Sequence, residues 1–506
     1  MDVPTTLSRN DGSNLGARMN QDENIGLSFL KVADANTIFP AIISETQVIN
    51  YEQLAHIVQS FAARMRGYGV DQKSLVALNT SDVVVSLAVL MATSLLGAKL
   101  TIASKLLAKT KAFSPTHFFK SPEVQGSKDV DFVEIDETWL PDLPTEPRNE
   151  ELNFEGYRSA DDPWLYLHTS GSTGTPKYFA LSQKMVFDRT TAIAADFPKR
   201  KTCFVSLFAY NSRPFFARAI GALLNACAIV DSQRFAFWEE CGVNLVCGSP
   251  TQAAAIFEPK PLHPKSPLLE VSGAPLTDTD AKILLNSFDN LIDIYGASET
   301  NKTFANIVTL DEAGSVVKTG KPLDSQVEIC NEAHEPCAPG ETGVVRVKNK
   351  YSISRYLNHT ETDAETFRDG WFYPGDIGMW GEKGNLLILG RNDDVFNVGG
   401  SKINAKLIDM MLCSAKGVSD AGCFLSPRPG LEHQIIAFAV CTGEVPFLNC
   451  AEDMQNLCRT RLGPLLTPTR IHQIDKIPRS EDGNIQRSAC QKLLLERVSS
   501  SSNDEV

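Results

Sequence analysis

The stretch TSGSTGTPK, residues 169–177, contains the residue types of a loop that binds an anion. Its glycines would let backbone N–H groups approach a phosphate closely, and its serine and threonine hydroxyls would add hydrogen-bond donors. Lys177 would add a positive charge. The GxxxxGK[ST] spacing of a Walker loop is not followed, so the loop is of another type. By itself such a run is more often an ordinary loop, and its interpretation depends on the motifs that follow it.

Four further motifs follow this loop in order along the chain. They are VSGAPL at 271–276, DIYGASET at 293–300, GWFYPGDIG at 370–378 and GRNDDVFNVGGSKIN at 390–404. Together the five motifs resemble those of the adenylate-forming superfamily, which includes acyl-CoA synthetases, adenylation domains of nonribosomal peptide synthetases (NRPS) and luciferases. The resemblance extends over about residues 40–495 and is greatest to the AMP-dependent acid–CoA ligases.

The resemblance implies a reaction in two steps. A carboxylate and ATP form an acyl-adenylate and pyrophosphate, and a thiol then displaces AMP. The first step brings two anions together, and Mg²⁺ and a positioned lysine would neutralise their charge. The implied small molecules are ATP, Mg²⁺, a carboxylic acid and coenzyme A. An enzyme that loads the phosphopantetheine of an acyl carrier protein is the alternative.

The same resemblance assigns residues to the phosphates and to the metal. The β- and γ-phosphates would be held by Thr169, Ser170, Gly171, Ser172, Thr173, Gly174 and Lys177. Ser298 would contact the α-phosphate, and Glu299 would hold Mg²⁺ through oxygen, the ligand atom that this cation prefers. Tyr178 stands where the family usually has glycine, so its bulk is expected to alter how the loop closes.

Other motif residues are assigned to the nucleoside. Tyr295 would pack its ring against the adenine. Asp376 would accept hydrogen bonds from both ribose hydroxyls, and Arg391 would also reach the ribose. The nucleotide pocket would be completed by Ser272, Gly273, Ala274, Gly296 and Ala297, of which the first three also border the acyl pocket.

The stretch from 390 to 404 would connect two domains. Asp393 matches the position about which the family's C-terminal domain rotates between the two half-reactions. Gly399, Gly400 and Lys402 would line the tunnel for the pantetheine arm, because glycine permits a close approach of the thiol.

One departure from the family's pattern concerns catalysis. The family's C-terminal lysine, which bridges the acyl carboxylate and the α-phosphate, falls in IPRSEDGNIQRSACQKLL, where its position is occupied by Asn484. Losing one group aimed at transition-state charge typically lowers a rate by about 10²- to 10³-fold. Three explanations stay open: an engineered substitution, a natural enzyme that adenylates slowly or uses another cation such as Lys402, and a protein that binds nucleotide or acyl-AMP without turnover.

The acyl pocket is expected between residues 205–226 and the YGAS motif. Its candidate walls are Phe208, Tyr210, Phe215 and Phe216, although an aromatic stripe of this kind is more often part of a core. No aspartate in this stretch is placed to pair with an α-amino group. This favours an acid without an amine, such as an aryl, medium-chain or polyketide-type acid.

Apolar strands alternate with helical segments from about residue 46 to residue 296, which is typical of an α/β fold with a largely parallel sheet. After about residue 320, short strands separated by Gly, Pro and Asn indicate an antiparallel, barrel-like subdomain. We therefore predict a large N-terminal adenylate-forming domain at 23–391 and a small mobile α+β C-terminal domain at 392–497. The polar ends, 1–22 and 498–506, are predicted to be disordered tails.

Composition narrows the class of protein. The net charge of −13 over 506 residues argues against nucleic-acid binding. The twelve cysteines show no zinc-site spacing, as expected of a reduced protein. The N-terminus lacks the apolar core of a signal peptide, and the longest apolar run, 83–98, is too short to span a membrane. A cytoplasmic protein without stable membrane insertion is expected.

Overall fold

The structure is a computed structural model of the chain. It describes residues 24–102, 114–124, 131–141, 160–169, 177–258, 260–331, 333–357, 360–391, 394–398, 401–428, 430–431, 434–443, 445–479 and 485–501. Within these ranges, no helix is long and apolar enough to cross a membrane.

The first sheet contains six strands in the order β6-β5-β3-β4-β7-β8. All neighbours are parallel except β7 and β8. Its strands are β3 (Leu75–Asn79), β4 (Lys99–Ile102), β5 (His117–Lys120), β6 (Val133–Glu134), β7 (Pro163–Thr169) and β8 (Lys177–Ser182). The crossover helix α4 (Val83–Leu95) begins at the N-cap Asp82 and is buried along its whole length, as its unbroken apolar pattern predicts.

The second sheet contains nine strands in the order β15-β14-β13-β12-β11-β9-β10-β1-β2. The six strands from β13 to β1 are parallel, and β2, β14 and β15 add antiparallel edges. The strands are β1 (Pro40–Ser44), β2 (Val48–Asn50), β9 (Cys203–Ser206), β10 (Ala228–Asp231), β11 (Leu245–Gly248), β12 (Ser266–Ser272), β13 (Phe288–Ala297), β14 (Asn301–Leu310) and β15 (Val316–Pro322). The carboxyl ends of its parallel strands carry the VSGAPL and YGASET motifs, at the edge where α/β sheets usually bind ligands.

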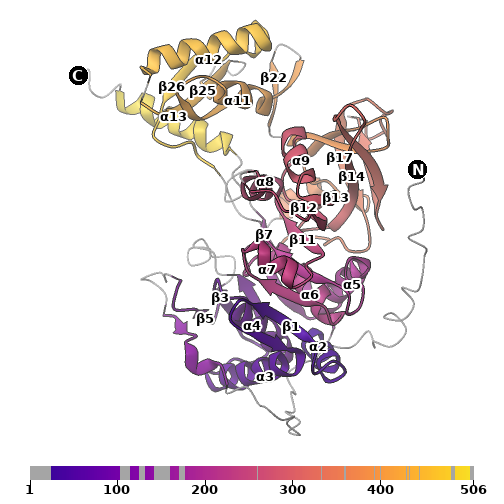
Figure 1. Ribbon diagram of the computed structural model, residues 1–506. Coiled ribbons are helices and arrows are strands. Elements are labelled where there is room, and N and C mark those ends of the chain that lie inside the picture. Colours follow the sequence, from indigo (N-terminus) through magenta and orange to yellow (C-terminus); the bar gives the residue numbers. More distant parts are fainter. Residues whose placement is uncertain are drawn as a thin grey trace.

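Helices cover these sheets and fill the spaces between them (Figure 1). They are α2 (Ile25–Asp34), α3 (Tyr51–Gly67), α5 (Gln183–Ala192), α6 (Arg213–Leu224), α7 (Phe235–Glu240), α8 (Pro250–Phe257) and α9 (Asp278–Leu285). The helix expected from the spacing of Leu54, Val58, Phe61 and Met65 is α3, and all four side chains are buried. An Asn50–Gln53 capping box fixes where this helix begins.

The third sheet is antiparallel throughout, as predicted for the region after residue 320. It consists of β16 (Gln326–Cys330), β17 (Gly343–Lys348), β18 (Phe367–Arg368), β19 (Trp371–Phe372), β20 (Asp376–Trp380) and β21 (Leu386–Arg391), with α10 (Thr360–Thr366) preceding β18. The register of β20 against β21 places Asp376 opposite Arg391.

The remaining elements form a smaller α+β group, coloured orange to yellow in Figure 1. They are the hairpin β22 (Val395–Val398) and β23 (Ser401–Asn404), the sheet β24 (Val418–Leu425), β25 (Ile435–Cys441) and β26 (Arg470–Gln473), and the helices α11 (Ala405–Cys413), α12 (Phe447–Arg461) and α13 (Arg487–Ser501). Two hydrophobic clusters here contain only residues from Phe396 onward. A separate core is the mark of a separate domain, so the predicted fold class is confirmed. The boundary at 391/392 and the mobility stay predictions.

Candidate functional site

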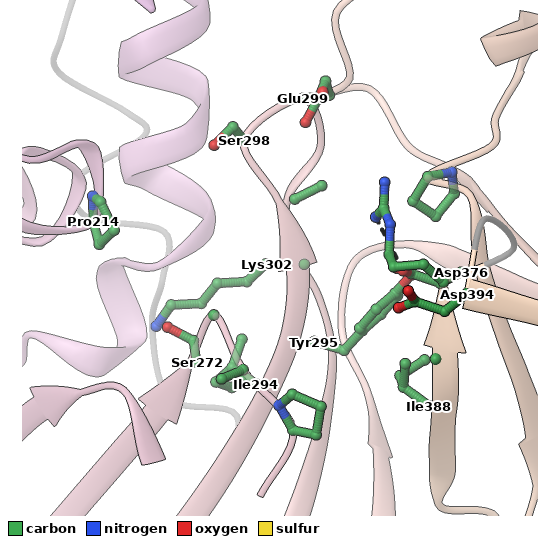
Figure 2. A pocket seen from close by; sticks show the side chains of 18 of the residues that line it. Pro214, Ser272, Ile294, Tyr295, Ser298, Glu299, Lys302, Asp376, Ile388 and Asp394 are labelled. Atoms are coloured by element: carbon green, nitrogen blue, oxygen red, sulfur yellow. Dashed lines mark hydrogen bonds and ion pairs between the residues drawn. The ribbon is translucent and has the colours of Figure 1, made fainter. Parts of the chain in front are cut away.

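A cavity of about 1300 Å³ brings motif residues from all three large sheets together. Lys177 begins β8, Ser272 ends β12, Tyr295 lies on β13, and Ser298 follows that strand. Asp376 enters from the antiparallel sheet (Figure 2). The cavity therefore lies where the carboxyl ends of parallel strands meet the third sheet.

The nucleoside side of the cavity is organised around Asp376. The Tyr295 hydroxyl donates to its Oδ2 at 2.6 Å, and Arg391 Nη1 donates to its Oδ1 at 3.0 Å. Burial and the Asp376 charge raise the pKa of Tyr295, so the phenol stays a donor. A carboxylate offers about four lone-pair sites, which leaves acceptor capacity for ribose hydroxyls.

The turn after β13 is held by a buried arginine that the sequence did not single out. Arg189 donates from Nη1 to the carbonyl of Ser298 at 2.9 Å and from Nη2 to the carbonyl of Glu299 at 2.7 Å. It also donates to the carbonyl of Tyr351. A charged donor shared among three carbonyls fixes the backbone that presents Ser298 and Glu299 to the cavity.

Tyr356 contacts both the predicted metal ligand Glu299 and the predicted catalytic residue Lys177, and the sequence did not single it out. Its hydroxyl donates to Glu299 Oε1 at 2.6 Å, and Lys177 Nζ lies 5.2 Å from the centroid of its ring. Burial, with the Glu299 charge and this hydrogen bond, raises the pKa of Tyr356. A lone tyrosine in the loop sequence SISRYLN carries no motif, so only the fold reveals this contact.

Glu299 fits the expected magnesium ligand. Glu299 lines the cavity and accepts a hydrogen bond from Tyr356 through Oε1. The described residues contain no group of three or more His, Cys, Asp or Glu that would form an all-protein metal site. Mg²⁺ usually binds through one or two carboxylates plus substrate phosphates and water. A single carboxylate beside a phosphate pocket matches that pattern.

The two ends of the phosphate loop are paired across β7 and β8. Thr169 is the register partner of Lys177, and Lys177 lines the cavity. Tyr178, one residue on, is buried and packs edge-on against His168 at 6.1 Å between ring centroids. Because neighbouring strand residues face opposite ways, the tyrosine that replaces the family's glycine points into the core beside the cavity-lining lysine.

Several predicted residues line the cavity as expected in position, and their roles stay predictions. These are Lys177, Ser272, Gly273, Ala274, Tyr295, Gly296, Ala297, Ser298, Glu299, Asp376 and Arg391. Gly296 is required sterically, because a Cβ there would lie 2.3 Å from the carbonyl oxygen of Asn301. Nine others lie outside the described residues: Ser170, Gly171, Ser172, Thr173, Gly174, Asp393, Gly399, Gly400 and Asn484. Lys402 lies on β23, with its backbone opposite Asn397.

The aromatic residues predicted as acyl-pocket walls lie mostly in the core, and their role as pocket walls stays a prediction. Phe215 and Phe216 belong to the large hydrophobic core, where the ring of Tyr210 also packs. The Tyr210 hydroxyl donates to Asp231, and Phe208 lies under the guanidinium of Arg218 at 5.4 Å. None of the four lines the main cavity, but Phe216 lines a smaller pocket that shares Arg213 and Ala217 with it.

The opposite face of α6 lines the main cavity with Arg213, Pro214, Ala217 and Arg218. These positions lie three and four residues apart on one helical face, whereas the phenylalanines lie on the core face. The wall is therefore cationic.

A charged network lies behind this wall. Glu270 accepts from Arg218 Nη2 at 2.5 Å through Oε1 and from Lys302 Nζ at 2.5 Å through Oε2. Lys302 also contacts Asp196 at 2.6 Å. Burial alone would raise the pKa of Glu270, yet the charges of Lys302 and Arg218 lower it below its usual value. The sequence held a signal for this network: Glu270 is the one charged residue in the apolar stretch LLEVS, and Arg218 is the one charged residue in the apolar stretch PFFARAIGALL.

The C-terminal group also contributes to the cavity lining. Ile485, Gln486 and Arg487 line it, immediately after the stretch that holds position 484. Arg487 is ion-paired with Asp394 at 2.7 Å and with Asp409 at 2.6 Å. These contacts tie the start of α13 to the segment after β21 and to α11.

Known proteins resemble this chain both in sequence and in fold. A family model described as AMP-binding enzyme matches residues 29–357. The oxalate–CoA ligase of Arabidopsis thaliana is 26% identical over 357 residues, covering 67% of this chain and 68% of that protein. The 2-succinylbenzoate–CoA ligase of Bacillus velezensis is 23% identical over 487 residues, covering 90% of this chain and 95% of that protein.

Solved structures show the same fold. The o-succinylbenzoate coenzyme A synthetase (MenE) of Bacillus subtilis in complex with AMP superposes with a TM-score of 0.78 at 18% identity, covering 92% of this chain and 98% of that one. Its complex with ATP and magnesium ion gives a TM-score of 0.75 at 19% identity, covering 91% and 98%. At these identities the likeness establishes the architecture and leaves the chemistry to the site.

Proposed function

The chain belongs to the AMP-binding enzyme family, and on this premise we propose that it is an AMP-forming acid–CoA ligase. One observation carries the proposal. A single cavity holds a carboxylate with tyrosine and arginine partners on its nucleoside side, and a lysine, a tyrosine and Glu299 on its phosphate side. This arrangement suits the binding of ATP with its α-phosphate turned toward an acid.

The nucleotide would be oriented by groups that the fold has already fixed. The Tyr295 ring offers a face for the adenine, while Asp376 accepts from the ribose hydroxyls. Lys177 would neutralise the β- and γ-phosphates. Magnesium bound at Glu299 supplies further charge neutralisation for the phosphates. Tyr356 holds the Glu299 carboxylate in place through its 2.6 Å hydrogen bond.

In the first step, a carboxylate oxygen of the acid would attack the α-phosphorus of ATP. The bond from the α-phosphorus to the bridging oxygen breaks, and pyrophosphate leaves with that oxygen. Ser298, on the turn fixed by Arg189, is placed to donate to the α-phosphate. Donors set before the reaction stabilise developing charge at no reorganisation cost.

In the second step, a coenzyme A thiolate would attack the acyl carbonyl carbon, and AMP would leave with the bridging oxygen. Rotation about Asp393 would bring Gly399, Gly400 and Lys402 to the thiol arm. The relatives named above are CoA ligases for different acids, which favours CoA over a carrier-protein thiol as acceptor and leaves the acid open.

Asn484 would make the first step slow. An amide offers a neutral hydrogen bond where the family has a charged one, and it has a shorter reach. The thioester-forming step would not depend on this residue. The second candidate function is that of a protein that binds acyl-AMP without turnover. Only Asn484 favours this function.

The test is formation of acyl-AMP and acyl-CoA, followed by mass spectrometry with a mixed acid panel, ATP, Mg²⁺ and CoA. The unmodified chain is run beside Asn484→Lys, and a phosphopantetheinylated carrier protein replaces CoA in a parallel reaction. Multiple turnovers to acyl-CoA support the proposal, with Asn484→Lys faster by about 10²- to 10³-fold. Acyl-AMP without thioester, or thioester only on the carrier protein, would contradict the CoA assignment. No product from either chain would favour the binding-only reading.

A further inference from the structure

Four basic side chains line the cavity. Arg213 and Arg218 lie on α6, Lys302 lies on β14 and Lys318 lies on β15. Figure 2 shows Pro214, the neighbour of Arg213, across the cavity from Asp376, so this wall is distinct from the nucleoside side. A pocket for a fatty or simple aromatic chain would be lined mainly by apolar groups.

Three of these four cations are neutralised within the protein. Arg218 and Lys302 share Glu270, at 2.5 Å each. Lys318 lies 3.7 Å from Asp293 and donates to a backbone carbonyl. These three therefore need no charge from a ligand.

Arg213 differs from the other three. Among the described residues, no hydrogen bond or ion pair engages its guanidinium, and Arg213 lines the cavity. Burial lowers the pKa of Arg213 to about 10, with the Glu299 charge opposing this effect and the Arg218 charge adding to it. Glu299 forms no ion pair with it and is the expected magnesium ligand. A partly buried cation with a like charge nearby is costly until an anion pairs with it.

We propose that Arg213 binds a second, ionised acidic group of the carboxylic acid, so that the substrates are acids with two acidic groups. This inference rests on the proposed function, because it names the substrate of the same site. A guanidinium presents a fork of donors that suits a carboxylate, which explains why an arginine rather than an apolar residue stands at this helix position.

The test uses pairs of acids that differ in one charge. Succinic, glutaric and phthalic acids are compared with succinamic, glutaramic and phthalamic acids, in which an amide replaces one carboxylate at nearly the same size. Binding to the full chain is measured by calorimetry with Mg²⁺ and a non-hydrolysable α,β-methylene analogue of ATP. Pyrophosphate release with ATP is measured separately. The binding measurement gives a result whether or not the chain with Asn484 turns over.

For at least one pair, the diacid is expected to bind about 10- to 100-fold more tightly than its monoamide, the range for hydrogen bonds to a charged group. Arg213→Gln should bring this ratio close to one, and Arg213→Lys should restore part of it. Arg459→Gln, an exposed arginine on α12 far along the chain, is the matched control and should keep the ratio. If a variant fails to fold, the comparison of diacids with monoamides in the unmodified chain still tests the preference for a second acidic group.

Two results would overturn the inference. One is a chain that binds neither diacids nor monoamides, or binds both members of every pair equally. The other is an Arg213→Gln variant that weakens both members by the same factor, since Arg213 would then act on the carboxylate or phosphate common to both. If diacids bind more tightly than monoamides but no acid supports pyrophosphate release, the ligase proposal is contradicted and the proposed role of Arg213 is supported.

Discussion

Replacing Glu270 by glutamine should destabilise the protein far more than the same change at its neighbour Asp196. Both carboxylates contact the same ammonium, Lys302 Nζ, at 2.5 and 2.6 Å. Glu270 also contacts Arg218, and its side chain is 5% exposed, whereas that of Asp196 is 36% exposed. The two substitutions, Glu270→Gln and Asp196→Asn, therefore form a matched pair that differs in burial and in the number of cations left unpaired.

The magnitude follows from what each change leaves behind. Glu270→Gln turns an amide N–H group toward one of two buried cations, and breaking a buried pair from one side costs about 3–5 kcal/mol. Asp196→Asn leaves Lys302 paired with Glu270, and exposed pairs are worth about 0–1 kcal/mol because water screens them. The free energy of unfolding should therefore fall about 3–5 kcal/mol for the first variant and at most about 1 kcal/mol for the second.

Urea unfolding followed by tryptophan fluorescence measures both, because Trp164 and Trp238 are buried in the N-terminal cores. The pH dependence gives a second check. The pKa of Glu270 is lowered in the fold, so its charge stabilises above the unfolded pKa of about 4.3, and this stabilisation is lost as the pH falls through the lowered value. The difference in the free energy of unfolding between the unmodified chain and Glu270→Gln should be constant from about pH 6 to about pH 8. It should shrink below about pH 4. Equal losses for the two variants would refute the assignment of Glu270 as a buried counter-ion.

Three further predictions concern the cavity. Tyr356→Phe should lower kcat/KM about tenfold and raise the Mg²⁺ concentration needed for half-maximal pyrophosphate release, since Glu299 loses a donor; an unchanged Mg²⁺ dependence would contradict this role. Asp376→Asn should raise the KM for ATP about 10- to 100-fold in steady-state kinetics and leave the KM for the acid within about threefold; equal changes in both would argue against a ribose contact. Gly296→Ala should cost about 1–3 kcal/mol in urea unfolding, because a Cβ meets the Asn301 backbone at 2.3 Å; the control Gly67→Ala, where nothing lies within 4 Å, should cost nothing.

The sequence by itself determined the features that depend on neighbours in the chain. The alternation of apolar strands and helices predicted the α/β architecture, because residue periodicity sets which face of an element is buried. The motif residues Ser272, Tyr295 and Asp376 were identified by resemblance to the family's motifs, each of which is one contiguous stretch of the chain, and all three line the cavity. The antiparallel region was found for the same reason, from turn residues at short intervals.

Only the tertiary structure decided which face of α6 lines the cavity. The sequence suggested Phe215 and Phe216 as pocket walls. In the structure both are buried in the core, and Arg213 and Arg218 on the other face of the helix line the cavity. Periodicity identifies a stripe on a helix, but it does not say whether core or cavity lies against it. That depends on where the neighbouring sheets pack.

The contacts that fix the site are also non-local. Glu270 meets Arg218 across 52 residues, Tyr356 meets Glu299 across 57, and Arg189 reaches the Glu299 carbonyl across 110. A charged residue in an apolar segment signals that a partner must exist, because an unpaired buried charge is too costly to retain. The packing of the sheets determines which residue is the partner, and the spacing of residues along the chain does not predict it.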